Sequence, residues 1–291
     1  TSGNNSDYSS VQYAPIYSDG SIGAWNTTTS LSVAKRDFGA VFYSGYILTT
    51  GGTSGQTGAQ VDYDTVSATA IKPAGDNGSF TTSADFDTTG RYGHTTIASN
   101  SYLYVIGGTT STEVVGFVNT IRKAAINTDG SLGSWGASGT AFTNARFGFS
   151  AVIYNNYMFI AGGYGACGLL GANAYCNDIQ SSQLNGSGDP GSWTASINTM
   201  TSARAFHATA VFNQYLYLIG GDDGNGAKAD INYVALGVDG TAGTWQTNTN
   251  NLPSARKSPA AVSANGFMYV VGGSNGTSSV YRDIFYSTID I

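Results

Sequence analysis

Arginine recurs at one place in a repeated pattern of this sequence. Five of the seven arginines stand 15 or 16 residues before the first glycine of a Gly-Gly pair: Arg36, Arg91, Arg146, Arg204 and Arg256. A guanidinium group presents a planar fork of N–H donors that fits carboxylates. If the five side chains gather at one opening, they would bind an anionic ligand. The alternative is architectural: each arginine would bond carbonyl groups or an aspartate inside its own repeat.

The two histidines occupy the same position of that pattern. His94 and His207 each follow an arginine by three residues. A metal ion would need at least one more ligand, and the sequence offers no obvious one. We therefore predict no bound metal there, and place both imidazoles with the arginines among the candidate ligand-binding residues.

Clustered aspartates raise two further kinds of site. The segment that holds Asp222, Asp223 and Asp230 is a weak calcium candidate, since calcium prefers oxygen ligands, but it lacks the spacing and final glutamate of an EF-hand. A solvated turn explains it more simply, and we expect no cofactor.

Two pairs of alternating aspartates could serve glycoside hydrolysis, which uses two carboxyl groups. They are Asp62 with Asp64 and Asp85 with Asp87. Alternate residues of a strand share a face, so each pair could converge. Surface turns are the simpler explanation, and motifs of nucleophilic or nucleotide chemistry are absent.

The two cysteines, Cys167 and Cys176, lie in one loop and predict a local disulfide. A disulfide indicates an oxidising compartment, and hence an extracellular or cell-surface protein. The loop, residues 164–177, is the longest that follows a Gly-Gly pair, and it contains Tyr164 and Tyr175. These apolar residues either form a contact surface or fold back over the structure beneath them.

These residues are positioned by five copies of one repeat. An apolar strand that ends in Gly-Gly, such as 102–108, recurs at 46–52, 157–163, 215–221 and 267–273. A turn of Asn, Ser or Gly type precedes each copy, which predicts a two-residue hairpin. We therefore expect inner hairpins over 36–52, 91–108, 146–163, 204–221 and 256–273. In one unit, for example, the first strand is expected over 147–154, the second over 157–161 and the third over 179–184. A fourth strand bearing a Trp completes each unit.

The fourth strands follow an outer turn with its own pattern. An Asp-Gly pair precedes a tryptophan by six residues at Asp19, Asp129 and Asp239, and Phe80 takes the tryptophan's place in another unit. A four-stranded unit of this size cannot bury both faces alone, so repeated units pack sheet on sheet, as in a β-propeller. The aromatic residues would fill the wedges between sheets.

At this point the sequence resembles the Kelch-repeat family. The matching residues run from Arg91 through His94 to Gly107-Gly108 and Trp135, and from Arg204 through His207 to Gly220-Gly221 and Trp245. The resemblance covers nearly the whole chain. It implies an all-β fold, a Kelch-like β-propeller of four-stranded antiparallel blades. The count of five inner hairpins predicts a five-bladed propeller, closed by pairing of N- and C-terminal strands. It also implies partners that dock on the face bearing the arginines and the loops after Gly-Gly.

The two ends of the chain do not fit five equal units. There are five inner hairpins but six third-strand segments, because 11–16 and 283–289 each supply one. We expect the segment around Trp25 to complete the last blade, which leaves 11–16 without a place. It could add an edge strand or pair with a neighbouring molecule. The first residues, without an initiating Met, are those expected of a processed protein or an excised module.

Composition bounds the function. The chain has 291 residues, is 41% hydrophobic and only 10% charged, and carries a net charge of −6. An acidic chain is a poor nucleic-acid binder, and no apolar run is long enough to span a membrane. We predict a single propeller domain, residues 1–291, that is a non-catalytic extracellular or adhesion module for a protein or glycan. The alternatives are a polysaccharide-active enzyme and a structural repeat module of a larger surface protein.

Overall fold

The computed structural model describes residues 7–55, 60–110 and 116–289. These residues fall into two compact units, one within 4–141 and the other within 142–291. The predicted single domain over 1–291 stays a prediction. Regular structure in the described ranges is β apart from one 3-10 turn, η1 (Leu169–Gly171). Within those ranges, no helix has the length and apolar character needed to cross a bilayer.

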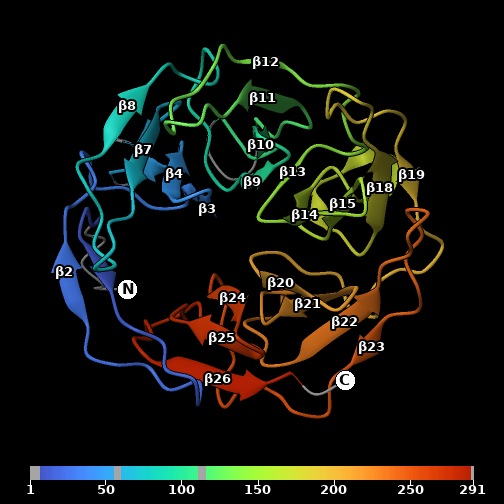
Figure 1. Ribbon diagram of the computed structural model, residues 1–291. Helices are drawn as coiled ribbons and strands as arrows, with labels where there is room; N and C mark the ends of the chain where they lie inside the picture. The colour runs from blue at the N-terminus through green and yellow to red at the C-terminus, as the bar shows by residue number, and fades with distance from the viewer. Residues whose placement is uncertain (1–6, 56–59, 111–115, 290–291) are drawn as a thin grey trace. The chain divides into compact units, whose positions relative to one another are not determined.

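The unit within 4–141 contains two antiparallel sheets of four strands (Figure 1). The first sheet is ordered β3 (Gly39–Tyr43), β4 (Tyr46–Thr50), β7 (Val66–Ala70) and β8 (Thr81–Ser83). The second is ordered β9 (Thr95–Ser99), β10 (Tyr102–Ile106), β11 (Ile121–Ala125) and β12 (Gly136–Ala137). The small pairs are β1 (Val11–Tyr13) with β2 (Asn26–Thr28), and β5 (Thr53–Ser54) with β6 (Val61–Asp62). Strands β3 and β9 are neighbours, so the two sheets meet along their first strands.

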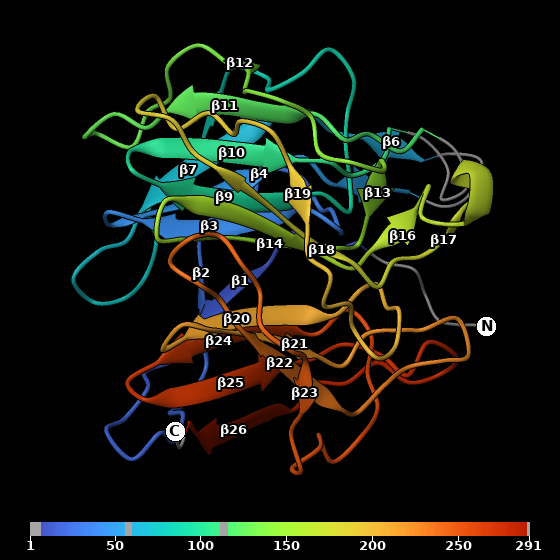
Figure 2. The same cartoon turned by 90° about the vertical axis from the view of Figure 1, so that its right-hand side faces the viewer.

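The unit within 142–291 repeats this plan (Figure 2). One sheet is β14 (Ser150–Tyr154), β15 (Tyr157–Ala161), β18 (Ile179–Gln183) and β19 (Thr194–Ala195). The next is β20 (Ala208–Phe212), β21 (Tyr215–Ile219), β22 (Ile231–Ala235) and β23 (Gln246–Thr247). The last is β24 (Ala260–Ala264), β25 (Phe267–Val271) and β26 (Ile284–Thr288). A small sheet joins β13 (Arg146–Phe147), β16 (Tyr164–Gly165) and β17 (Ala174–Tyr175).

The five inner hairpins are confirmed, and their turns have the predicted backbone. Both turn residues have positive φ in every hairpin: for example Asn155 at 45° and Asn156 at 64°, and Asn265 at 52° and Gly266 at 80°. This is the conformation of a two-residue turn whose twist matches that of the flanking strands. Turn chemistry therefore fixes the register of each first and second strand.

The Gly-Gly pairs join one sheet to the next. Gly220 and Gly221 have φ of 64° and 97°, which side chains rarely adopt. The N–H of Gly221 donates to the carbonyl of Arg256, which opens the following hairpin, at 2.9 Å. A Cβ on Gly220 would lie 2.5 Å from that same oxygen. Within their units, Gly52 and Gly163 donate in the same way, at 2.8 Å, to the carbonyls of the next repeat's arginine.

The core lies between neighbouring sheets, where the predicted aromatic wedges sit. Trp245 is 6% exposed and packs with Phe159 and Leu218 from two successive sheets. Trp135 meets Phe86 edge to face, with ring centroids 5.9 Å apart. Each of these tryptophans precedes its fourth strand by one residue rather than lying on it as expected. Trp25 differs, since 52% of it is exposed.

Two expected strands need correction. The strand expected over 147–154 is interrupted: Gly148 has φ of 61°, so β13 ends at Phe147 and β14 begins at Ser150. The segment expected over 11–16, which had no place, is also shorter and pairs with β2, with Tyr13 opposite Asn26. β1 and β2 thus make an outer hairpin of their own, and closure through the terminal strands stays a prediction.

The Gly-Gly geometry predicts a large effect of one methyl group. In Gly221→Ala, the new Cβ would lie 2.7 Å from the carbonyl oxygen of Ala205, at a φ of 97°. We expect a loss of at least about 1–2 kcal/mol in the free energy of unfolding, measured by urea titration. Gly186→Ala is the matched control, because no atom lies within 4 Å of its Cβ position. Equal stability of the two variants would contradict this account.

Candidate functional site

Four of the five predicted arginines are buried inside their own repeats. Arg91, Arg146, Arg204 and Arg256 are 0–3% exposed. In each, Nη1 donates to the carbonyl of the first glycine 16 residues later, at 3.4, 3.0, 3.1 and 2.8 Å respectively. The guanidinium group therefore closes the base of the inner hairpin.

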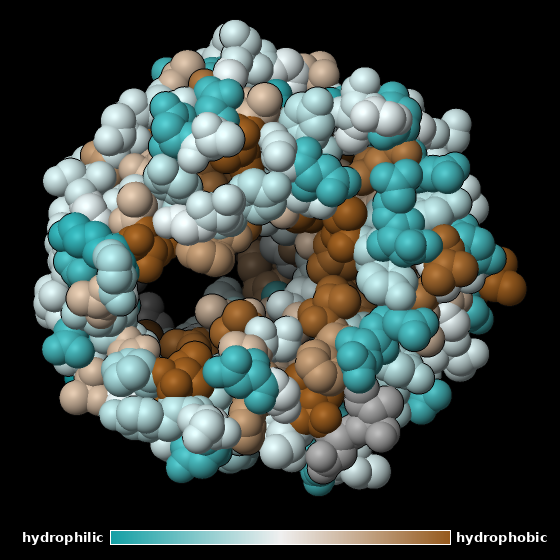
Figure 3. All heavy atoms as spheres, in the orientation of Figure 1, coloured by the Kyte–Doolittle hydropathy of each residue, from teal (hydrophilic) through white to brown (hydrophobic). Residues whose placement is uncertain are grey.

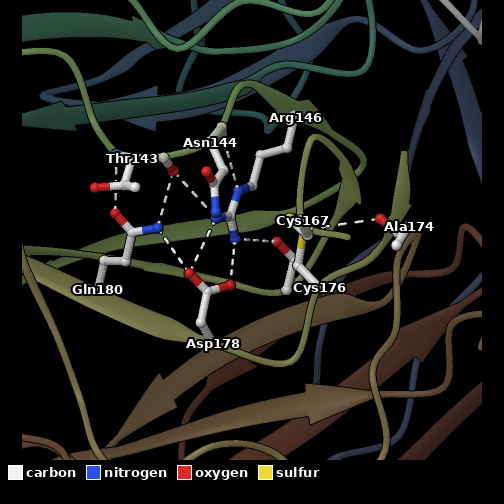
Figure 4. The surroundings of a disulfide bond; sticks show 9 residues. Thr143, Asn144, Arg146, Cys167, Ala174, Cys176, Asp178 and Gln180 are labelled. Atoms are coloured by element: carbon white, nitrogen blue, oxygen red, sulfur yellow. Dashed lines mark hydrogen bonds and ion pairs between the residues drawn. A yellow bond between two sulfur atoms is a disulfide. The ribbon is translucent and has the colours of Figure 1, made fainter. Parts of the chain in front are cut away.

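A carboxylate neutralises each of these buried guanidinium groups. Asp178, Asp230 and Asp283 each stand directly before a third strand and form ion pairs with Arg146, Arg204 and Arg256 at 2.6, 2.7 and 2.9 Å. Figure 4 shows the first pair, with Gln180 donating to the same aspartate. Burial acts to raise the pKa of Asp230, but the hydrogen bond and charge of Arg204 outweigh it, so that pKa lies below its usual range.

In the second repeat, other residues neutralise the buried guanidinium group of Arg91. Thr120 stands before its third strand, and its hydroxyl accepts from Arg91 at 3.0 Å. Asp87 supplies the carboxylate and also pairs with Arg122 at 2.7 Å. These contacts agree with the architectural alternative, in which each arginine bonds carbonyl groups or an aspartate inside its own repeat. The four side chains face the interior of their repeats rather than an opening.

In the first repeat, Lys35 and not Arg36 takes the position of the buried arginines. Lys35 stands 16 residues before Gly51, is 7% exposed, and donates from Nζ to the carbonyl of Gly51 at 2.9 Å. Burial lowers the pKa of its ammonium group to about 8. Arg36 instead lies partly exposed and donates to Asp7 at 2.7 Å and to the carbonyl of Gly55 at 2.9 Å. The spacing of 15 rather than 16 was the sequence signal for this exchange.

The two histidines are buried and neutral. Burial is the main cause that lowers the pKa of each to about 3, and neighbouring positive charge adds to it. Nε2 of His94 lies 2.8 Å from the hydroxyl of Thr50 in the preceding sheet. Both ring nitrogens of His207 are buried without a hydrogen-bond partner. Ala161, the last residue of β15, stands where Thr50 ends β4, which explains the missing partner.

The calcium candidates do not converge. Asp230 pairs with Arg204, while Asp223 pairs with Lys228 at 2.6 Å. Asp222 lies 3.6 Å from Nζ of Lys257 and accepts the N–H of Gly224. Across the described ranges, one group of metal-ligand side chains is close enough to share an ion: Cys167, Cys176 and Asp178. Two of its members are joined as a disulfide.

The paired aspartates are arranged differently from the expectation. Asp85 and Asp87 lie in the loop after β8 rather than on a strand. Burial raises the pKa of Asp64, and the charges of Asp85 and Asp87 raise it further, so these three carboxyl groups are neighbours. Asp87 is held by two arginines, and Asp62 accepts from Gln60 at 2.6 Å. Asp87 is thereby committed to structural ion pairs with Arg91 and Arg122.

The disulfide predicted between Cys167 and Cys176 is present, with Cα atoms 5.4 Å apart. It lies beside the Arg146–Asp178 pair (Figure 4). The N–H of Cys176 donates to the carbonyl of Gly163 at 2.8 Å, and its carbonyl accepts from Arg204. The base of the loop is therefore fixed to the rigid Gly-Gly and arginine framework.

Aromatic rings support the stapled loop from below. Tyr164 and Tyr175 pack edge to face with centroids 5.1 Å apart, and Tyr164 packs in the same way on Phe147. Phe147 in turn meets Phe206 of the next repeat. The Tyr175 hydroxyl donates to Asp222 at 3.3 Å, and burial is the main cause that raises its pKa to about 12. Both predicted tyrosines thus pack at the base of the loop and fix it in place.

The tip of the loop projects into solvent. Leu169 and Leu170 are 92% and 108% exposed. Leu170 has φ of 56°, a conformation that side chains seldom adopt. The tip therefore does not fold back over the structure beneath it, in contrast to Tyr164 and Tyr175. Figure 3 shows one face of the molecule, on which hydrophobic residues lie among hydrophilic ones.

Comparisons with known proteins agree with this architecture. A family model described as the KLHDC2/KLHL20/DRC7 Kelch-repeats domain matches residues 93–290. Kelch domain-containing protein 3 of Rattus norvegicus and of Homo sapiens are each 29% identical over 197 residues, which is 64% of this chain and 48% of those proteins. The chain thus matches about half the length of these curated relatives. The solved "Structure of YjhT" superimposes with a TM-score of 0.70 at 13% identity, over 91% of this chain and 85% of that one, which shows the propeller fold.

The missing hydrogen-bond partner of His207 predicts a stabilising substitution. In Ala161→Thr, the hydroxyl would stand beside His207 as Thr50 stands beside His94. Because the site is tight, Ala161→Val is the matched control, with the same branching and no hydroxyl. We expect the Thr variant to be more stable than the Val variant by about 1 kcal/mol in urea unfolding at neutral pH. A Val variant as stable as the Thr variant would show that His207 gains nothing from a partner.

Proposed function

Because this chain belongs to the KLHDC2/KLHL20/DRC7 Kelch-repeats family, we propose that it is a non-catalytic module that binds another protein through its stapled loop. Kelch domains generally bind proteins. The observation that carries the proposal is the pair Leu169 and Leu170, which the disulfide holds almost fully in solvent. Exposed leucines on a fixed support are suited to insertion into an apolar cleft of a partner.

The footing of the loop supports this assignment. The rings of Tyr164, Tyr175 and Phe147 and the backbone bonds of Cys176 hold the loop before a partner arrives. Less conformational entropy is then lost on binding than for a free loop. An aliphatic tip favours a protein over a glycan, and Asp87, one of the four carboxylates considered for catalysis, is held in ion pairs with Arg91 and Arg122.

Removal of the apolar tip tests the function. We expect Leu169→Ser with Leu170→Ser to abolish protein binding, because the buried contact would be replaced by hydroxyls. Binding is measured by probing protein and glycan arrays with the purified chain and confirming each interaction by surface plasmon resonance. Ile197→Ser is the matched control, since Ile197 is also 96% exposed but lies outside the loop. Unchanged binding by the double variant, or binding to glycans alone, would refute the proposal.

We further propose an extracellular or cell-surface location, on the support of the Cys167–Cys176 disulfide. A bridge across nine residues stabilises a fold by about 2–3 kcal/mol. We expect both thiols to resist alkylation in protein taken from its native cells under denaturing, acid-quenched conditions. Full alkylation without prior reduction, judged by mass spectrometry, would place the chain in a reducing compartment instead.

A further inference from the structure

The first repeat holds a buried positive charge that no carboxylate neutralises within the described part of the chain. Lys35 is 7% exposed, and its Nζ donates to the carbonyl of Gly51 at 2.9 Å. Burial is the sole cause that lowers its pKa to about 8, so the group is mostly protonated at pH 7. The ring of Phe38, 5.3 Å from Nζ, offers a weak cation–π contact. Burial of an ammonium group without an anion beside it is costly.

The arginine-closed repeats show how the same charge is neutralised elsewhere. In three of them, the Nη1 atom that donates to the glycine carbonyl also donates to Oδ1 of an aspartate. These second bonds run from Arg146 to Asp178 at 2.6 Å, from Arg204 to Asp230 at 3.2 Å, and from Arg256 to Asp283 at 2.9 Å. Figure 4 shows the first of them. One nitrogen atom therefore contacts both a glycine carbonyl and an anionic oxygen.

Thr65 stands in the first repeat where those aspartates stand in theirs. It directly precedes the third strand, β7, and its carbonyl accepts the N–H of Gly51 at 2.9 Å. Asp178 and Asp230 accept the N–H of their first glycines in the same way, both at 3.1 Å. Thr65 is half-buried, and its hydroxyl has no hydrogen-bond partner among the described residues. Nζ of Lys35 and this hydroxyl are therefore the donors that the register places beside the position of the carboxylate.

The arrangement of the second repeat is not available to the first. In the second repeat, where Thr120 stands before the third strand, the carboxylate of Asp87 comes from four residues before Arg91. Leu31 holds that position relative to Lys35. An aliphatic side chain cannot neutralise an ammonium group, so neither of the two known arrangements supplies an anion to Lys35.

Asp64 is the carboxylate closest to Thr65 in the sequence, but it belongs to another cluster. Burial is the main cause that raises its pKa, and the charges of Asp85 and Asp87 raise it further. A neighbouring ammonium group would lower that pKa, and Lys35 is not among the groups that shift it. No described side chain therefore balances the charge of Lys35.

We propose that a small monovalent anion, chloride or a carboxylate of the size of formate, binds between Nζ of Lys35 and the hydroxyl of Thr65. The ion takes the position of the aspartate carboxylate and accepts a second N–H of the ammonium group. Larger anions are excluded, because the site is buried and fits a carboxylate in the other repeats. All of its residues lie in the unit within 4–141. The stapled loop takes no part, so this inference stands apart from the proposed function.

Exchange of the anion at one total salt concentration tests the site. The chain is unfolded with urea at pH 7 in mixtures of sodium gluconate with sodium chloride or sodium formate. Gluconate is too large to enter. An ion that binds only the folded chain stabilises it by mass action, so a rise of about tenfold in chloride or formate above the dissociation constant should lower the unfolding equilibrium constant by the same factor.

Two substitutions locate the ion. Thr65→Asp supplies the carboxylate within the chain, so this variant should be more stable than the original chain in gluconate and should not respond to chloride or formate. Thr81→Asp is the matched control, because it adds the same charge at an exposed position of the same sheet, and it should keep the response. Lys35→Met should lose the response, whereas Lys72→Met, which removes an exposed charge, should keep it.

An original chain that is equally stable in chloride, formate and gluconate would overturn the proposal. So would a response that persists in Thr65→Asp or Lys35→Met, because the ion would then bind elsewhere. A Thr65→Asp variant no more stable in gluconate than Thr81→Asp would also refute it, since the register would not bring that position to Lys35. Thr65→Asp decides the question alone, so the test holds even where Lys35→Met does not fold.

Discussion

The contact between an arginine and a Gly-Gly pair holds this molecule together. Arg256 illustrates it: its guanidinium donates to the carbonyl of Gly272 in its own hairpin, while its main-chain carbonyl accepts the N–H of Gly221 from the hairpin before. One residue thus closes its own repeat and joins it to its neighbour. A buried guanidinium without a carboxylate is costly, and Asp283 removes that cost. The glycines are required because a Cβ would strike the same carbonyl.

This constraint separates the rigid part of each repeat from the part that can vary. The backbone is fixed up to the second glycine, and the chain then leaves toward the third strand by a loop that takes no part in the contact. In one repeat that loop is long, carries a disulfide and presents Leu169 and Leu170. The framework therefore supports an exposed tip without having to adjust to it.

Much of this arrangement could be predicted from the sequence because it depends on local chemistry. Turns such as Asn155-Asn156 accept positive φ, glycine pairs mark strand ends, and two cysteines nine residues apart fit one bridge. Which carboxylate pairs with each arginine could not be predicted from the sequence, because Asp178 and Asp87 reach their arginines from different parts of the repeat. The register of 11–16 depended on pairing with β2, and the interruption at Gly148 depended on the small sheet that β13 joins.

The spacing of 16 residues before Gly51 could have predicted that Lys35 replaces the arginine of the other repeats. The surroundings of Lys35 could not be predicted from the sequence. Lys35 donates to Gly51 as the arginines do to their glycines, yet among the described residues it forms no ion pair with a carboxylate. An ammonium group also lacks the second fork that lets arginine reach an aspartate while bonding a carbonyl. The lowered pKa of about 8 follows from this burial.

One consequence concerns how the fold opens. Regions of a protein unfold locally with different free energies, and the least compensated region opens first. The repeats closed by Arg146, Arg204 and Arg256 each have a complete ion pair, whereas the first repeat relies on a single donor and a dehydrated charge. We therefore expect local opening to begin at the lysine-closed first repeat, before the repeats closed by Arg146, Arg204 and Arg256.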